Sequence, residues 1–185
     1  MNKKSILTVI SLSVISTFLI IGVAYAVSYL AVSLSPDTPA GGYLPATSTN
    51  VAFVKFDFTN TASSTEDIIL DKLAVTNYGT SSTTFRVFSM LYLYDDTATS
   101  TLIATTTKRI GENTFVFNDF AFTIPSSTVK SLLIKGDLGS SATSSQTIRL
   151  GIDNESAVRA HGAITGATTT ISGNFPILGN TFTIY

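Results

Sequence analysis

The sequence has no cysteine, no tryptophan and a single histidine, His161. Without cysteine the chain cannot form a disulfide framework, an iron-sulfur cluster, a thiolate nucleophile or a lipid-modified cysteine. A zinc site is also disfavoured, because such sites take most of their ligands from cysteine and histidine. Stability must therefore come from packing, hydrogen bonds or assembly.

Charge is scarce as well. Charged residues make up 12% of the chain, and its formal net charge at pH 7 is -1. Nucleic-acid binding and steering toward anionic lipid both need a strong basic field, which this composition does not supply. We therefore expect no nucleic-acid partner.

Hydroxyl side chains are abundant instead. The chain of 185 residues contains 29 Thr and 23 Ser, while apolar residues make up 44%. Threonine favours strands and serine is common in turns. This length suits one domain with a sizeable core, whose surface we expect to be rich in hydroxyls rather than in charges.

Residues 1–26 have the pattern of an export signal. Lys3 and Lys4 precede an apolar stretch at 6–23, and Ala24-Tyr25-Ala26 provides the small-x-small pattern that signal peptidase accepts. We expect cleavage after Ala26 and a mature protein that is extracellular or at the cell surface. The alternative is an uncleaved membrane anchor through residues 6–23, which approach the length that crosses a bilayer. A type IV pilin leader is excluded, because no acidic residue occurs before Asp37.

Beyond Ala26 the dominant hydrophobic period is two, which is typical of half-buried strands. Turn-forming residues separate the alternating segments, and no amphipathic helix is evident. The pattern predicts an all-β fold, a single immunoglobulin-like or jelly-roll β-sandwich of about ten strands. We assign residues 27–49 to an N-terminal strand and linker and residues 50–185 to the sandwich. The expected strands are 27–35, 53–58, 69–75, 85–94, 101–107, 114–124, 130–138, 147–152, 157–161, 167–172 and 181–185.

Alternation also predicts the core. Fourteen aliphatic and aromatic positions fall on the inward faces of the expected strands, and burying them would offset much of the cost of ordering the chain. They are Leu30, Val32, Phe56, Phe58, Leu73, Val75, Leu91, Leu93, Phe120, Phe122, Leu132, Ile134, Leu150 and Ile152.

Several motifs together resemble a known group of modules. They are Ser33-Leu34-Ser35-Pro36-Asp37-Thr38-Pro39, Val75-Thr76-Asn77-Tyr78-Gly79-Thr80, Leu91-Tyr92-Leu93-Tyr94-Asp95-Asp96, Phe122-Thr123-Ile124-Pro125 and Gly179-Asn180-Thr181-Phe182-Thr183-Ile184. This order is similar to that of surface modules in Patescibacteria-type exported proteins. The resemblance covers most of residues 27–185 and implies an exported Ig-like surface module. Such modules often occur as tandem copies, whereas this chain has one.

Catalysis finds little support in the residues. His161 lies in Arg159-Ala160-His161-Gly162, and the sequence lacks the Gly-x-Ser-x-Gly elbow of a Ser-His-Asp hydrolase. We interpret this imidazole as a surface or strand-end group and expect a protein that is not an enzyme. A pair of glycosidase carboxylates brought together from distant strands is the alternative.

Acidic residues at strand ends raise the question of calcium, a hard cation that takes oxygen ligands from loops. The candidate ligands are Asp95, Asp96, Asp153 and Glu155, none of which has EF-hand spacing. The simpler interpretation is turn chemistry, in which Asp and Asn side chains bond their own backbone. We expect no cofactor, with structural calcium as the alternative.

The segment 27–35 is a lone alternating strand with Leu30, Val32 and Leu34 on one face, and the next strong strand follows about 15 residues later. A strand so tethered can pair with the open sheet edge of a neighbouring molecule. We therefore predict a subunit of a homopolymeric surface assembly such as a filament, tube, sheath or S-layer. Only the layout is similar to TasA-type fibre and archaeal cannula or pilus subunits. The alternative for the strand is a place in its own sandwich.

The second functional hypothesis is a monomeric adhesin or carbohydrate-binding module. Its platform would come from tyrosines that the pattern puts on the surface, namely Tyr29, Tyr43, Tyr78, Tyr92 and Tyr94. The absence of tryptophan makes a sugar platform the less favoured of the two hypotheses.

Overall fold

A computed structural model describes residues 28–61, 66–80, 87–107, 109–110 and 113–185. The predicted leader lies outside these residues, and within them no helix is long and apolar enough to cross a membrane. The described chain is all-β apart from one 3-10 helix, η2 (Glu155–Ala157). Its strands are β1 (Tyr29–Leu34), β2 (Gly42–Leu44), β3 (Val51–Asn60), β4 (Ile68–Asn77), β5 (Phe88–Asp95), β6 (Thr101–Thr106), β7 (Arg109–Ile110), β8 (Thr114–Ile124), β9 (Val129–Leu138), β10 (Thr147–Ile148), β11 (Leu150–Ile152), β12 (Val158–Gly162), β13 (Thr170–Ser172), β14 (Ile177–Leu178) and β15 (Phe182–Ile184).

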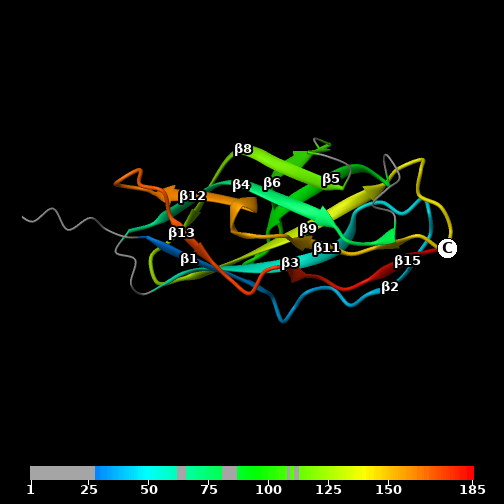
Figure 1. The fold of residues 1–185 in the computed structure, drawn as a ribbon, viewed down its shortest axis with the longest axis horizontal. Helices are drawn as coiled ribbons and strands as arrows, with labels where there is room; N and C mark the ends of the chain where they lie inside the picture. Colours follow the sequence, from blue (N-terminus) through cyan, green and yellow to red (C-terminus); the bar gives the residue numbers. More distant parts are fainter. Residues whose placement is uncertain (1–27, 62–65, 81–86, 108, 111–112) are drawn as a thin grey trace, which may run out of the picture.

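These strands form three sheets (Figure 1). Sheet A has the order β13-β1-β3-β9-β5-β6, and sheet C has the order β14-β11-β4-β8-β7 with β12 also paired to β4. The small sheet B has the order β10-β15-β2. All pairings are antiparallel except β1 with β13 and β15 with β2. The turn between β12 and β13 and the C-terminus lie at opposite ends of the long axis (Figure 1).

One hydrophobic core joins the sheets, and phenylalanines mark its centre. Phe53 on β3 meets Phe88 on β5 edge to face, with ring centroids 5.3 Å apart, and meets Phe182 on β15 at 5.2 Å. Phe88 in turn meets Phe115 on β8 at 5.4 Å. Such edge-to-face pairs are the preferred aromatic geometry. The predicted β-sandwich is therefore confirmed, because inward side chains of all three sheets share this core.

Thirteen of the fourteen predicted core positions are buried; Phe120 is only half-buried. The reason is a bulge in β8, where Asp119 adopts a positive φ of 60° and the register with β4 shifts. Between the pairs Lys72–Asn118 and Leu70–Phe122, three residues of β8 lie opposite one residue of β4. This bulge leaves Phe120 off the inward face, and alternation resumes at Phe122.

The predicted linker is not free of regular structure. Its residues Gly42–Leu44 form β2, which pairs with β15 near the end of the chain. β7 and β14 were also missed, because two or three residues are too few to show an alternating pattern.

Candidate functional site

The predicted assembly strand is β1, and the model places it in the chain's own sandwich. It pairs along Leu30 to Leu34 with β3 and along Tyr29 to Ala31 with β13. Leu30 and Val32 are 0% and 3% exposed, whereas Leu34 is 36% exposed. Leu30 and Val32 therefore contribute to the core of their own chain, and Leu34 lies at its margin.

The outer edge of β1 is only half covered. β13 ends opposite Ala31, and the next residue, Gly173, lies close to β1, since a Cβ there would be 2.7 Å from the Val32 carbonyl oxygen. Beyond that point lies an open hollow of about 450 Å³, lined by Val32, Ser33, Leu34, Gly173, Asn174, Pro176, Ile177 and Leu178. No charged side chain is among these residues, so the hollow suits an apolar or neutral group.

At the other edge of the same sheet lies β6, with the sequence Thr-Leu-Ile-Ala-Thr-Thr. Among the described strands β6 pairs only with β5, so its far side is a sheet edge. Only its end is covered, where the buried Thr106 hydroxyl donates a hydrogen bond to the Val116 carbonyl of β8. Natural edge strands are usually protected by charged residues, proline or a bulge. β6 has no charged residue and no proline within Thr101–Thr106, although its register with β5 shifts at Ile103, an extra residue that forms a bulge. Its Leu102 is 50% exposed. The nearby edge of β8 differs in carrying an exposed charge, Asp119.

The turn between β12 and β13 is held by a buried carboxylate. Glu66, 4% exposed, accepts hydrogen bonds from the N–H groups of Ile164 (2.8 Å) and Thr165 (3.0 Å) and from the Thr165 hydroxyl (2.7 Å). These bonds, led by that of the Thr165 hydroxyl, lower the pKa of Glu66. Gly162 permits this approach, since a Cβ there would lie 2.1 Å from Glu66 Oε1. The turn thus presents Ile164, 85% exposed, from a fixed frame.

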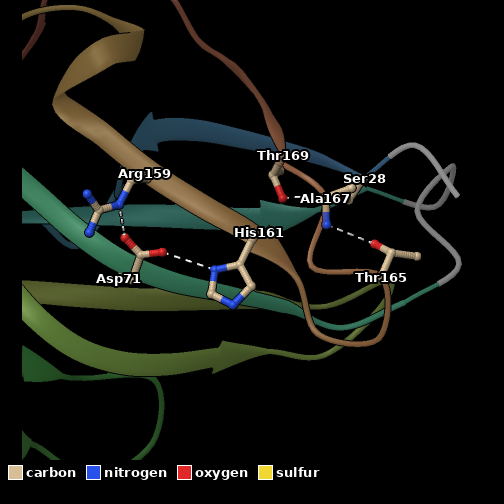
Figure 2. A network of polar contacts seen from close by, with 7 residues as sticks. All are labelled: Ser28, Asp71, Arg159, His161, Thr165, Ala167 and Thr169. Atoms are coloured by element: carbon tan, nitrogen blue, oxygen red, sulfur yellow. Dashed lines mark hydrogen bonds and ion pairs between the residues drawn. The ribbon is translucent and has the colours of Figure 1, made fainter.

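Figure 2 shows the polar contacts beside this turn. Asp71 lies at the bulge between β4 and β12, where it accepts a hydrogen bond from Arg159 Nε and lies 3.0 Å from His161 Nδ1. Ser28 and Thr169 share a buried hydrogen bond of 2.9 Å that ties β1 to the β13 segment. His161 therefore belongs to a partly exposed polar cluster on a strand, in keeping with the interpretation as a surface imidazole.

The four candidate calcium ligands lie on two sheets. Asp95 and Asp96 lie at the end of β5 in sheet A, where Lys130 Nζ is 3.7 Å from Asp95 and Lys55 Nζ is 3.1 Å from Asp96. Asp153 and Glu155 follow β11 in sheet C. Within the described part of the chain, no three carboxylate, histidine or cysteine side chains gather closely enough to hold a metal ion. The calcium site stays a prediction.

Asp153 is already engaged. It accepts a hydrogen bond of 2.5 Å from the Tyr78 hydroxyl and one of 2.7 Å from the Asn154 amide. Burial first, and then the bond and charge of Asp153, raise the pKa of Tyr78 to about 12. A cation at Asp153 would have to compete with this phenol.

Comparison with known proteins gives no family. No family model matches the chain, and no curated protein matches it in sequence. The resemblance to Patescibacteria surface modules thus rests on the quoted motifs alone.

Similar solved structures do exist. The seventh ScaB type I cohesin from Pseudobacteroides cellulosolvens is 13% identical, with 85% of this chain and 92% of the cohesin covered and a TM-score of 0.38. A family 123 glycoside hydrolase from Clostridium perfringens is 8% identical over 84% of this chain, which spans only 27% of that enzyme, with a TM-score of 0.38. BslA, a bacterial hydrophobin, is 11% identical, with coverages of 85% and 92% and a TM-score of 0.28. At these values function must be argued from the chain's own residues.

Sequence reasoning missed the two open edges of sheet A. The β6 run of six residues without charge or proline was visible, but only the sheet order identifies it as an edge. The half-covered edge of β1 depends on its pairing with β13, about 140 residues away along the chain, which no local pattern reports.

Proposed function

We propose that this protein is a non-catalytic, exported structural protein, a subunit of a homopolymeric extracellular assembly such as a filament, tube, sheath or S-layer. Export is supported by the leader pattern of residues 1–26. The observation that supports the proposal is the uncharged outer edge of β6 with its exposed Leu102. Such an edge exposes a monomer to aggregation, but it lets a subunit pair with its neighbours.

The test is direct. The protein, expressed with its leader and recovered outside the cell, should form ordered polymers visible by negative-stain microscopy, and its sedimenting fraction should rise with concentration. N-terminal sequencing of the same sample checks for cleavage after Ala26. A monodisperse monomer at millimolar concentration, with and without calcium, would refute the proposal.

Strand donation by β1 would take the form of exchange in this fold. Because β1 fills a place in its own sandwich, a donated strand would have to replace the same strand of the neighbour. A cysteine pair at Ala31 and Thr59, which are opposite one another on β1 and β3, would lock the strand in its own domain when oxidised. Polymers that survive this lock would exclude exchange; their loss on oxidation and return on reduction would support it.

Structural calcium is a secondary element of the proposal. Asp153 and Glu155 on one sheet, and Asp95 and Asp96 on another, could each bind a cation across a subunit contact, completing a shell that one copy lacks. Polymer yield measured with calcium and with a chelator tests this, with magnesium as the control cation.

An adhesin or carbohydrate-binding module is the competing function, and one observation favours it. Tyr43 on β2 is 76% exposed, and Tyr185, which directly follows β15, is 65% exposed. The pairing of β2 with β15 and the hydrogen bond from the Tyr185 N–H to the Leu44 carbonyl bring the two tyrosines to one end of the molecule. Of the other predicted platform residues, Tyr29 and Tyr78 are about two-fifths exposed, while Tyr92 and Tyr94 are half-buried. Glycan-array binding by a monomer, lost on Tyr43→Ala, would favour this function.

A further inference from the structure

Sheet A runs between two edges that carry no charge. Its six strands begin at β13, beside the half-covered edge of β1, and end at β6. Neither β6 nor residues 170–178, which form β13 and one wall of the hollow, contain a charged residue. Two open and neutral edges on opposite sides of one sheet are the geometry from which a continuous intermolecular sheet is built.

We propose that copies of this chain join head to tail through sheet A, with β6 of one copy adding to the outer edge of β13 of the next and Leu102 entering the hollow beyond it. The inference rests on the proposed polymer and names its interface. It requires no exchange of β1.

The donor side offers both parts of a strand-addition contact. Backbone groups on the far side of β6 provide the hydrogen bonds, and alternate side chains enter pockets on the acceptor. Leu102 is the large apolar side chain that β6 leaves 50% exposed. Burying the Leu102 side chain in the contact would contribute to the free energy of binding, because in the monomer this side chain is exposed to water.

The acceptor side is shaped to receive such a side chain. Gly173 and Asn174 directly follow β13, so the hollow lies just beyond the end of the strand to which β6 would add. Leu34, Pro176 and Leu178 supply apolar walls. A volume of about 450 Å³ exceeds the needs of one leucine, which leaves room for neighbouring atoms of the incoming strand.

Neutral surfaces on both sides favour a second copy as the occupant, and the small contact area sets how strongly it binds. A contact between these two edges buries no unpaired charge, which is the costliest error at an interface. A six-residue strand is only about 20 Å long, and a contact of that size falls at the small end of protein interfaces. Pairs in dilute solution should therefore be weak, and polymers should form above a threshold concentration.

The head-to-tail arrangement is preferred over self-pairing of β6. A β6 to β6 contact is two-fold symmetric and stops at a dimer, and it leaves both the edge of β13 and the hollow uncovered. A contact between unlike edges repeats without closing and uses both of them. Growth then continues along the direction of the hydrogen bonds in sheet A.

A charge swap tests the interface. Leu102→Lys and Leu34→Glu each put an unpaired charge into every contact, so each should raise the threshold concentration for polymerisation about tenfold or more. The double variant places opposite charges on the two sides and should restore polymerisation. Sedimentation over a concentration series, with negative-stain images, provides the measurement on the exported protein.

Ile164→Lys is the matched control, because it makes the same chemical change at an 85% exposed aliphatic residue outside the interface. Its threshold should equal that of the wild type. Circular dichroism and urea unfolding check that each variant is folded. If Leu34→Glu lowers the stability, Asn174→Glu, an exposed position at the same hollow, replaces it.

The outcomes separate the two proposals. A wild-type protein that never polymerises refutes the proposed function itself. Polymers that persist unchanged in Leu102→Lys and Leu34→Glu leave the function standing and overturn this interface. A discrete dimer that Leu102→Lys abolishes and Leu34→Glu does not would show self-pairing of β6 and also overturn the head-to-tail contact.

Discussion

Replacing Leu30 with alanine tests whether the first strand belongs to its own domain. Leu30 is 0% exposed and lies opposite Asn60 on β3, so truncation would leave a cavity in the core. The removed carbons carry about 2.4 kcal/mol of transfer free energy, and the cavity brings the expected loss in the free energy of unfolding to about 3 to 4 kcal/mol. With a urea m-value of about 2 kcal/mol/M, the unfolding midpoint should fall by about 1.5 to 2 M.

The assay is urea unfolding of dilute, monomeric protein, followed by circular dichroism and intrinsic tyrosine fluorescence. Leu34→Ala is the control, because this leucine is 36% exposed and its truncation should cost about 1 kcal/mol or less. A midpoint that does not move in Leu30→Ala would refute the reasoning, since it would mean that the monomer folds without the strand. Only a donated strand could then explain the apolar face of β1.

Three further outcomes are expected. The hydrogen bonds that lower the pKa of Glu66 contribute fully to stability above the ordinary carboxyl pKa of 4.5, and this contribution is lost as the pH falls through the lowered pKa. In Glu66→Gln the free energy of unfolding should therefore fall less steeply as the pH is lowered through this range. Absorbance titration should show one tyrosine ionising near pH 12, absent in Tyr78→Phe, and calcium bound at Asp153 would lower that pKa. Thr106→Val removes a 2.8 Å buried hydrogen bond to the Val116 carbonyl and should cost about 1 to 3 kcal/mol in urea unfolding.

The alternating pattern was sufficient for most of the fold. Strands of six or more residues such as β3, β4 and β9 show period two because one face meets the core, and their positions were predicted within a few residues. The turn between β8 and β9 was also readable, since Pro125 and the serines after it form a turn with Ser127 at positive φ.

What the sequence did not provide was long-range pairing. The bulge at Asp119 depends on how β8 meets β4, and its two extra residues change which phenylalanine faces inward. The sheet order decides that Asp95 and Asp153 belong to different sheets and that β6 is an edge. These facts follow from tertiary contacts, which local propensity does not encode.

The unbroken six-strand order of sheet A also sets a length. Hydrogen-bonded strands lie about 4.8 Å apart, so six strands advance about 29 Å across the sheet. A polymer that continues this sheet from copy to copy should therefore diffract with a strand reflection near 4.8 Å and a subunit repeat near 29 Å along its axis. Every sixth strand along such a fibre would be chemically the same, so the width of one sheet would set the axial repeat of the polymer.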